Sequence, residues 1–283
     1  MKLGHIGDPG QERPVVFLSP DTVVDISSVT DAVDGGFLSS GGVELLAEVI
    51  SQMPPEPLAG RRVGAPLARP HQILCIGLNY SDHAAETGQA VPTEPIVFTK
   101  SPNTLIGPND PVRIPRGGTK TDWEVELGIV VGARTSYLNS PEDARRAIAG
   151  FCVVNDVSER AFQLERGGQW SKGKSAETFN PAGPWLVTPD DVPDVRDLAI
   201  YLDVNGVARQ RGSTATMIFD PYDIVYYLSQ FFVLEPGDLI NTGTPPGVGM
   251  GLEPPEFLAA GDVMELGIDG LGTQRQLVLG PRA

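Results

Sequence analysis

The sequence predicts a β-rich α+β fold, with a small N-terminal domain and linker at 1–69 and a larger domain at 70–283. Many short segments are rich in β-branched and aromatic residues, as strands are. Only a few segments space their apolar residues as amphipathic helices do. The 33 glycines and 26 prolines stand between these segments without a repeating period, which indicates many short strands and turns rather than disorder.

The N-terminal segment is predicted to hold two strands, at 14–19 and 22–29, and one helix at Val43–Met53. A stretch rich in Pro, Gly and Arg follows from Pro54 to Pro70 and is typical of a linker. The segment carries few residues suited to chemistry, so we assign no function to it.

The larger domain begins with a dense apolar run and is expected to form a mixed or antiparallel sheet. Two helices are predicted within it, at 140–150, with Ser140 as N-cap and Gly150 at the end, and at 220–232. The expected strands lie at 73–78, 96–100, 123–132, 150–158, 184–188 and 199–206.

Charge and cysteine content exclude several classes of protein. Lys and Arg total 21 against 36 Asp and Glu, a net charge of −15 with no basic cluster, which disfavours binding to nucleic acid or to an anionic membrane. The only cysteines, Cys75 and Cys152, lie in apolar runs and are expected to be free thiols. With no apolar leader and no apolar run of membrane-spanning length, we expect a cytoplasmic protein.

Two acidic residues, Glu124 and Glu126, lie two positions apart in the segment DWEVELGIVVG. In a strand, residues two apart project from the same face, so the two carboxylates would lie side by side. The run that follows is apolar on both faces, which predicts a buried central strand. Because buried carboxylates pair with a cation or coordinate a metal, we favour a metal or a buried basic partner over a solvated sheet face.

A third acid, Asp156, follows another apolar strand in the segment VVNDVSER. Taken alone, this position is typical of a turn residue. Together with Glu124 and Glu126, however, it completes an all-oxygen ligand set without a Cys or His cluster. Such a set suits Mg²⁺ or Mn²⁺, is compatible with Ca²⁺, and does not suit zinc.

His83 is the histidine best placed for chemistry, because Glu86 follows it by three residues. One helical turn would bring the carboxylate beside the imidazole and raise its basicity toward water. An incidental pair on a surface helix is the alternative, and the spacing alone favours neither. Gly77, Gly88 and Pro92 bracket the segment, as in a lid that closes over a substrate.

Two lysines, Lys172 and Lys174, lie in the polar segment QWSKGKSAETF. A lysine near a bound 2-oxo acid could hold its carboxylate or stabilise developing negative charge. The local pattern does not rank one lysine above the other.

The segment INTGTPPGVGMG is only superficially similar to a nucleotide-binding loop. A dinucleotide-binding loop must open a helix, whereas two prolines follow here where the helix would have to run. We therefore reject nucleotide binding. A glycine-rich turn that brings backbone amides and the hydroxyl of Thr242 or Thr244 to a small anion fits better.

Taken together, these segments resemble the fumarylacetoacetate hydrolase superfamily over roughly residues 73–279. Five motifs agree in order and spacing: GLNYSDHAAE, DWEVELGIVVG, NDVSERAFQ, KGKSAETFNPAGPW and NTGTPPGVG. The resemblance implies a mixed β-sandwich roll as catalytic domain, a variable small N-terminal domain, and a homodimer.

The resemblance also implies roles for individual residues, and it ranks Lys174 above Lys172. Mg²⁺ or Mn²⁺ would be bound by Glu124, Glu126 and Asp156, water would be activated by His83 with Glu86, the active-site lysine would be Lys174, and the substrate contacts would be Gln163 and Thr244.

The implied substrate is a small 2-oxo acid, and the implied reaction is hydrolysis of a carbon-carbon bond in a 2,4-diketo acid with release of pyruvate. The run NDVSERAFQLERGGQWSKGKSAETF, with GLGTQRQ near the end, is most similar to the branch that hydrolyses 2,4-diketo-3-deoxy-rhamnonate or fuconate. Oxaloacetate decarboxylation and isomerisation with decarboxylation are the alternatives within the superfamily. A catalytically silent metal- or oxo-acid-binding protein is a third alternative, disfavoured because every expected site residue is present.

Overall fold

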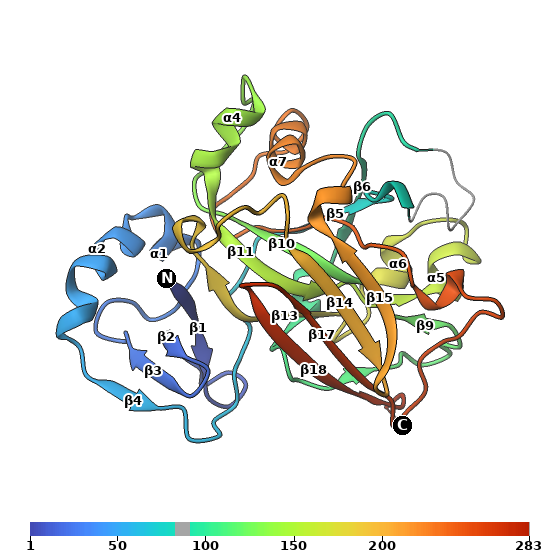
Figure 1. The fold of residues 1–283 in the computed structure, drawn as a ribbon, viewed down its shortest axis with the longest axis horizontal. Helices are drawn as coiled ribbons and strands as arrows, with labels where there is room; N and C mark the ends of the chain where they lie inside the picture. Colours follow the sequence, from blue (N-terminus) through green and yellow to red (C-terminus); the bar gives the residue numbers. More distant parts are fainter. Residues whose placement is uncertain (83–90, 283) are drawn as a thin grey trace.

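Two β-sheets packed against each other form the body of the protein (Figure 1). The computed structural model describes residues 1–82 and 91–282. The strand-rich architecture with mixed sheets that the sequence predicts is confirmed. No helix in the described part of the chain has the length and apolar character needed to cross a bilayer.

The large sheet combines parallel and antiparallel neighbours. A short strand, β7 (Leu105–Ile106), pairs with β13 off the main path. In order across the sheet, the other strands are β4 (Pro55–Pro57), β3 (Thr22–Asp25), β2 (Arg13–Ser19), β1 (Lys2–Ile6), β13 (Asn180–Val187), β11 (Ile148–Asn155), β10 (Val125–Val131), β16 (Leu239–Asn241), β5 (Ile73–Gly77) and β6 (Ile96–Lys100).

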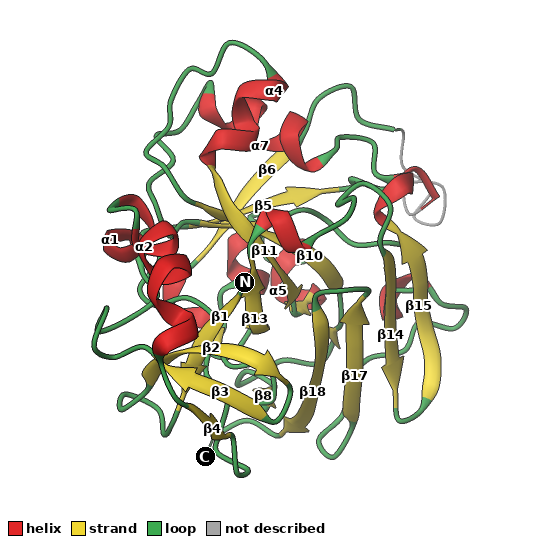
Figure 2. Cartoon of the chain, turned by 60° about the vertical axis from the view of Figure 1, so that its left-hand side comes forward, coloured by secondary structure: helices red, strands yellow, loops and turns green. Residues whose placement is uncertain are grey.

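The second sheet covers one face of the large sheet around β10, β11 and β13 (Figure 2). Its strands are, in order, β15 (Val207–Ser213), β14 (Ala199–Val204), β17 (Val263–Ile268), β18 (Gly272–Leu279) and β8 (Val112–Arg113). A two-stranded ribbon is formed by β9 (Thr121–Asp122) and β12 (Ser158–Glu159).

The helices are short, and α4 and α7 lie side by side at one end of the molecule (Figures 1 and 2). The α-helices that lie wholly within the described part of the chain are α1 (Gly35–Ser39), α2 (Gly42–Val49), α4 (Pro141–Ala144), α5 (Arg160–Leu164), α6 (Ser171–Lys174) and α7 (Pro221–Ser229). The 3₁₀ turns are η1 (Ile50–Gln52), η2 (Pro102–Thr104), η3 (Arg145–Ala147), η4 (Pro189–Asp191), η5 (Thr214–Thr216) and η6 (Gly249–Gly251).

Strand β10 is central and buried along its whole length, as its apolar sequence predicts. Val125 and Leu127 belong to the core between the two sheets, whereas Val130 packs in a second core on the other face of the large sheet. Because side chains alternate between the two faces along a strand, Glu126 lies on the same face as Val130, opposite to the second sheet.

The predicted helix at 140–150 is shorter than expected. It ends with η3 at Ala147, because Ile148 already pairs with Val131 of β10 as the first residue of β11. Ser140 is the N-cap residue, but its hydroxyl bonds to the Asp143 side chain instead of capping a backbone N–H. The helix predicted at 220–232 forms as α7, with Asp220 as a capping-box residue, and it ends at Ser229.

The N-terminal strands continue the large sheet, because Lys2 and Leu3 of β1 pair with Val187 and Leu186 of β13. Their helices, α1 and α2, pack over one face of this part of the sheet (Figure 2). The domain boundary at residue 70 stays a prediction.

Both cysteines are free thiols, as expected, and they lie in the same core as Val130. Burial raises the pKa of Cys152 to about 12 and raises the pKa of Cys75 well above its ordinary value. Neither thiol is placed to react in the folded protein.

His5 on β1 is a buried neutral histidine that ties the N-terminal segment together. Its Nδ1 lies 2.8 Å from the Ala65 carbonyl oxygen, and its Nε2 accepts the Val33 N–H at 3.0 Å. Because Nε2 must accept, the proton of the neutral ring is on Nδ1. Burial lowers the pKa of His5 below its ordinary value of 6.5.

We therefore expect the free energy of unfolding to fall as the pH drops from 6.5 toward the lowered pKa of folded His5, because the unfolded chain takes up this proton first. Denaturant unfolding at pH 7.5 and at about pH 5 measures this effect. Between the two pH values, the free energy of unfolding should fall less for His5→Gln than for the wild type. His71→Gln, at an exposed position, is the control and should follow the wild type. An identical pH dependence in all three proteins would contradict this role.

Candidate metal centre and active site

Three carboxylates meet where β10 begins and β11 ends. Val125 and Asn155 are register partners, and the Asp156 N–H donates to the Glu124 carbonyl at 2.8 Å just beyond the paired ends. One carboxylate oxygen from each of Glu124, Glu126 and Asp156 lies within 4.8 Å of the other two. The structure thus brings together the three acids that stand out in the sequence.

These carboxylates are buried, with exposed fractions of 6% for Glu124, 1% for Glu126 and 0% for Asp156. Burial raises the pKa of Glu126 well above its ordinary value, and the charges of Asp156 and Glu124 raise it further. The Gly243 N–H donates to Glu126 Oε2 at 2.8 Å. Within residues 1–82 and 91–282, no Lys or Arg forms an ion pair with Glu126, so Glu126 differs from the other two acids in having no such partner there.

Lys174, at the end of α6, is the lysine that reaches the acids. Its Nζ lies 2.7 Å from Glu124 Oε2 and 2.8 Å from Asp156 Oδ2. Burial lowers the pKa of Lys174, but the two carboxylates outweigh it, so the pKa is raised and the ammonium stays charged. Lys172 is exposed instead and bonds to the Arg166 carbonyl.

Two further buried cations, which the sequence analysis missed, complete the charge network. Lys100, the last residue of β6, contacts Asp156 Oδ1 and donates to the Phe179 carbonyl at 2.6 Å. Arg160, the first residue of α5, has Nη2 at 2.7 Å from Glu124 Oε1. The available signals were a lysine that ends an apolar strand and an arginine four residues after Asp156.

Protein groups fix the Arg160 guanidinium at each of its nitrogens. Nε lies 2.8 Å from Asp122 Oδ2, Nη1 donates to Gln163 Oε1 at 3.0 Å, and Nη2 faces Glu124. The other Asp122 oxygen accepts the Gly249 N–H at 2.7 Å. Asp122 is therefore a positioning residue that holds both Arg160 and the turn at η6.

The glycine-rich loop after β16 presents a backbone amide to the acids. Gly243 has φ +93°, and a Cβ there would lie 2.8 Å from the Asn79 Cβ, so the close approach requires glycine. The hydroxyls of Thr242 and Thr244 both donate to carbonyl oxygens of β10 at 2.9 Å. The Gly243 N–H, rather than a threonine hydroxyl proton, is thus directed at the acids.

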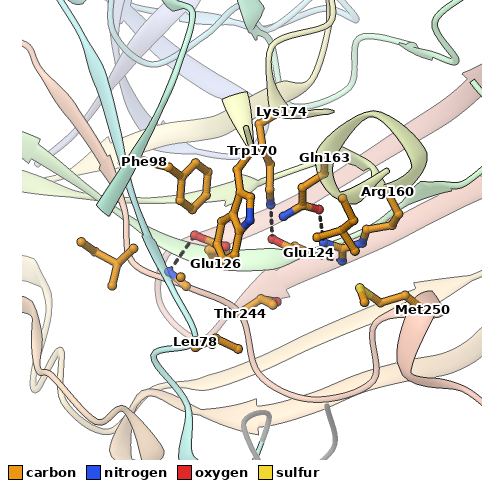
Figure 3. A pocket seen from close by; sticks show the side chains of 14 residues that line it. Leu78, Phe98, Glu124, Glu126, Arg160, Gln163, Trp170, Lys174, Thr244 and Met250 are labelled. Atoms are coloured by element: carbon orange, nitrogen blue, oxygen red, sulfur yellow. Dashed lines mark hydrogen bonds and ion pairs between the residues drawn. The ribbon is translucent and has the colours of Figure 1, made fainter. Parts of the chain in front are cut away.

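A pocket of about 80 Å³ opens onto Glu124, Glu126 and Lys174 (Figure 3). Gln163 and Thr244 line it, in keeping with their predicted substrate contact, which stays a prediction. The pocket therefore combines anionic and cationic groups in a space suited to a small polar molecule.

The predicted dyad, His83 with Glu86, lies outside the described residues. The segment that leads to it is anchored beside the glycine-rich loop, because Asn79 Nδ2 donates to the Thr242 carbonyl at 2.8 Å and its Oδ1 accepts the Phe219 N–H at 2.8 Å. The roles of His83 and Glu86 stay predictions.

The three acids fit a hard divalent cation. All donors are carboxylate oxygens, as Mg²⁺ and Mn²⁺ prefer, and a cation would supply the positive charge that Glu126 lacks in its buried position. Among the residues described, no other group of acids, histidines or cysteines has such a geometry.

Comparison with known proteins gives consistent matches along the whole chain. Residues 72–279 match the family described as "Fumarylacetoacetate (FAA) hydrolase C-terminal". A protein of Burkholderia multivorans named "Putative hydrolase" is 48% identical over 283 residues, which is 100% of both chains.

Two solved structures are similar over nearly the full length. Fumarylacetoacetate hydrolase from Exiguobacterium antarcticum has a TM-score of 0.86 and 33% identity, with 99% of each chain covered. Maleylpyruvate hydrolase from Sphingobium sp. SYK-6, in complex with manganese(II) and pyruvate, has a TM-score of 0.83 and 26% identity, with 100% of each chain covered. The chain belongs to the fumarylacetoacetate hydrolase family and is an enzyme of hydrolase type.

Proposed function

We propose that the protein is a divalent-metal-dependent hydrolase that cleaves a carbon-carbon bond in a 2,4-diketo acid and releases pyruvate. The observation that carries the proposal is the buried group of Glu124, Glu126 and Asp156, with the Lys174 ammonium 2.7 Å from Glu124 at the pocket. Such a group can bind a chelating 2-oxo acid and stabilise an enolate.

The cofactor we propose is Mg²⁺ or Mn²⁺, held by Glu124, Glu126 and Asp156. A divalent cation there would act as a Lewis acid that polarises the oxygens of a 2-oxo acid. The solved maleylpyruvate hydrolase, which holds manganese(II) together with pyruvate, supports the choice of metal and of product.

The proposed reaction consumes one water for each substrate, R–CO–CH₂–CO–COO⁻. His83, oriented by Glu86, takes a proton from the water, and the oxygen adds to the distal carbonyl carbon. The bond between that carbon and the CH₂ group then breaks, and its electron pair leaves as the enolate of pyruvate. The proton that His83 took from the water is returned to the enolate carbon, which gives pyruvate. The other product is the carboxylic acid R–COOH, which releases a proton to solvent as R–COO⁻.

Lys174 would stabilise the enolate, because its ammonium is charged, buried and already oriented by Glu124 and Asp156. Arg160 acts through Glu124, which it holds at 2.7 Å. We further propose that the substrate is a small 2-oxo acid and that the chain forms a homodimer, in line with the family resemblance.

Release of pyruvate from a panel of substrates tests the function. We expect turnover of acylpyruvates and of 2,4-diketo-3-deoxy-rhamnonate, loss of turnover with EDTA, and recovery with Mg²⁺ or Mn²⁺. Faster turnover of oxaloacetate than of every diketo acid would instead identify a decarboxylase. Metal binding without turnover of any substrate would identify a silent binding protein.

A further inference from the structure

The pocket has a mixed lining (Figure 3). Its polar side chains are Glu124, Glu126, Arg160, Gln163, Lys174 and Thr244. Its apolar side chains, here called the apolar wall, are Ile76, Leu78, Phe98, Leu164, Trp170 and Met250.

The Trp170 indole is fixed in this wall by packing on two sides. Its ring meets the Phe98 ring edge to face, with centroids 5.4 Å apart. On the other side it covers Gly77, where a Cβ would lie 2.7 Å from Trp170 Cζ3. The close fit at Gly77 shows that the wall is a packed surface and not a loose rim.

Leu164 extends the apolar wall to the solvent. It is 46% exposed and is the last residue of α5, the helix that also supplies Arg160 and Gln163. A ligand held at the acids would therefore also lie against this apolar, partly open wall.

In the described part of the chain, no unpaired cation lines the pocket. Lys174 and Arg160 are the only cationic residues among those that line the pocket in the described chain, and both are already paired with carboxylates. A second carboxylate at the distal end of a ligand would lie against apolar side chains without a cationic partner, which is unfavourable.

We propose that the substrate is a monocarboxylic 2-oxo acid whose distal group is short, uncharged and mainly apolar, and that Trp170 and Leu164 select it. This inference rests on the proposed function, because it assumes that the 2-oxo acid end is held at Glu124, Glu126 and Asp156. It sets the chain apart from enzymes whose substrates carry a carboxylate at both ends.

Binding of two matched 2-oxo acids tests the inference without turnover. 2-Oxohexanoate and 2-oxohexanedioate differ in a distal methyl against a distal carboxylate, and their dissociation constants for the metal-loaded protein can be measured by calorimetry. We expect the monoacid to bind about tenfold more tightly or better, since the diacid buries an unpaired charge. Equal binding, or tighter binding of the diacid, would overturn the inference.

Turnover of a graded series separates this inference from the proposed function. Among acylpyruvates, kcat/KM should rise about fourfold for each added methylene until the pocket is full, and a terminal carboxylate should reverse the gain. If no acylpyruvate releases pyruvate, the proposed function is wrong. The binding preference is then still decided by the calorimetric comparison of the two 2-oxo acids. If pyruvate is released fastest from the terminal carboxylates, the inference alone is wrong.

A charge placed on the wall gives an independent check. Leu164→Lys should lower the ratio of the diacid dissociation constant to the monoacid dissociation constant by about tenfold, because it supplies the cation that the wall lacks. Leu45→Lys, at a 52% exposed position on α2, is the matched control and should leave the ratio unchanged. An unchanged ratio in Leu164→Lys, with a wild-type unfolding curve, would show that the distal group does not reach this wall.

Discussion

Lys174→Met is expected to lower kcat for pyruvate release by about 10³-fold. The methionine keeps the length of the side chain but removes the charge that would stabilise the pyruvate enolate. It also leaves Glu124 and Asp156 without the ammonium that now lies 2.7 and 2.8 Å from them. Steady-state kinetics at saturating metal give kcat, and a Mn²⁺ titration of the variant should show that the metal still binds.

Lys172→Met is the matched control for this change. Lys172 lies two residues away on the same helix, but it is exposed and bonds only to a backbone carbonyl in the described chain. Its kcat should stay within about twofold of the wild type, as expected for a surface substitution. A similar loss in both variants, or full activity in Lys174→Met, would contradict the role of Lys174.

Glu124→Gln and Glu126→Gln should both abolish metal binding and lower kcat by about 10³-fold or more, yet they should change stability in opposite directions. Glu124 faces two buried cations, Lys174 and Arg160, so its loss should destabilise the metal-free fold by about 3 kcal/mol. Glu126 has no such partner in the described chain, and its pKa is raised. Its ionised form therefore costs stability above pH 4.5, and the neutral glutamine should stabilise the metal-free protein.

Denaturant unfolding in EDTA and turnover with added metal measure the two effects separately. Glu165→Gln, whose side chain is 57% exposed and pairs with Lys120, serves as the control and should match the wild type in both. If Glu124→Gln left metal binding and turnover intact, the assignment of the metal centre would be wrong.

The acids could be predicted from the sequence because their placement is local. Glu124 and Glu126 follow the two-residue period of a buried strand, and Asp156 follows the neighbouring strand that pairs with it. The cations could not be predicted in this way. Lys100 lies 56 positions before Asp156, and Arg160 reaches Asp122 across 38 positions, so these pairings depend on the folded topology.

Some elements of the fold also could not be predicted, because their residues are not typical of the secondary structure that they form. In β18 the buried side chains are Gln274, Gln276 and Val278, and Leu277 is 41% exposed, so polar residues interrupt the apolar alternation of a strand. Gln274 instead donates to the Val153 carbonyl at 2.8 Å and serves as a polar link between the sheets. The helix predicted at 140–150 was too long, because the pairing of Ile148 with β10 overrides the local helix propensity.

The most direct test of the metal centre is a titration of the metal-free protein with Mn²⁺, followed by electron paramagnetic resonance and paired with an assay of pyruvate release. We expect one tight site per chain, recovery of turnover in proportion to its occupancy, and loss of both in Glu126→Gln. Turnover that persists in excess EDTA, or a tight site that survives in Glu126→Gln, would contradict this expectation.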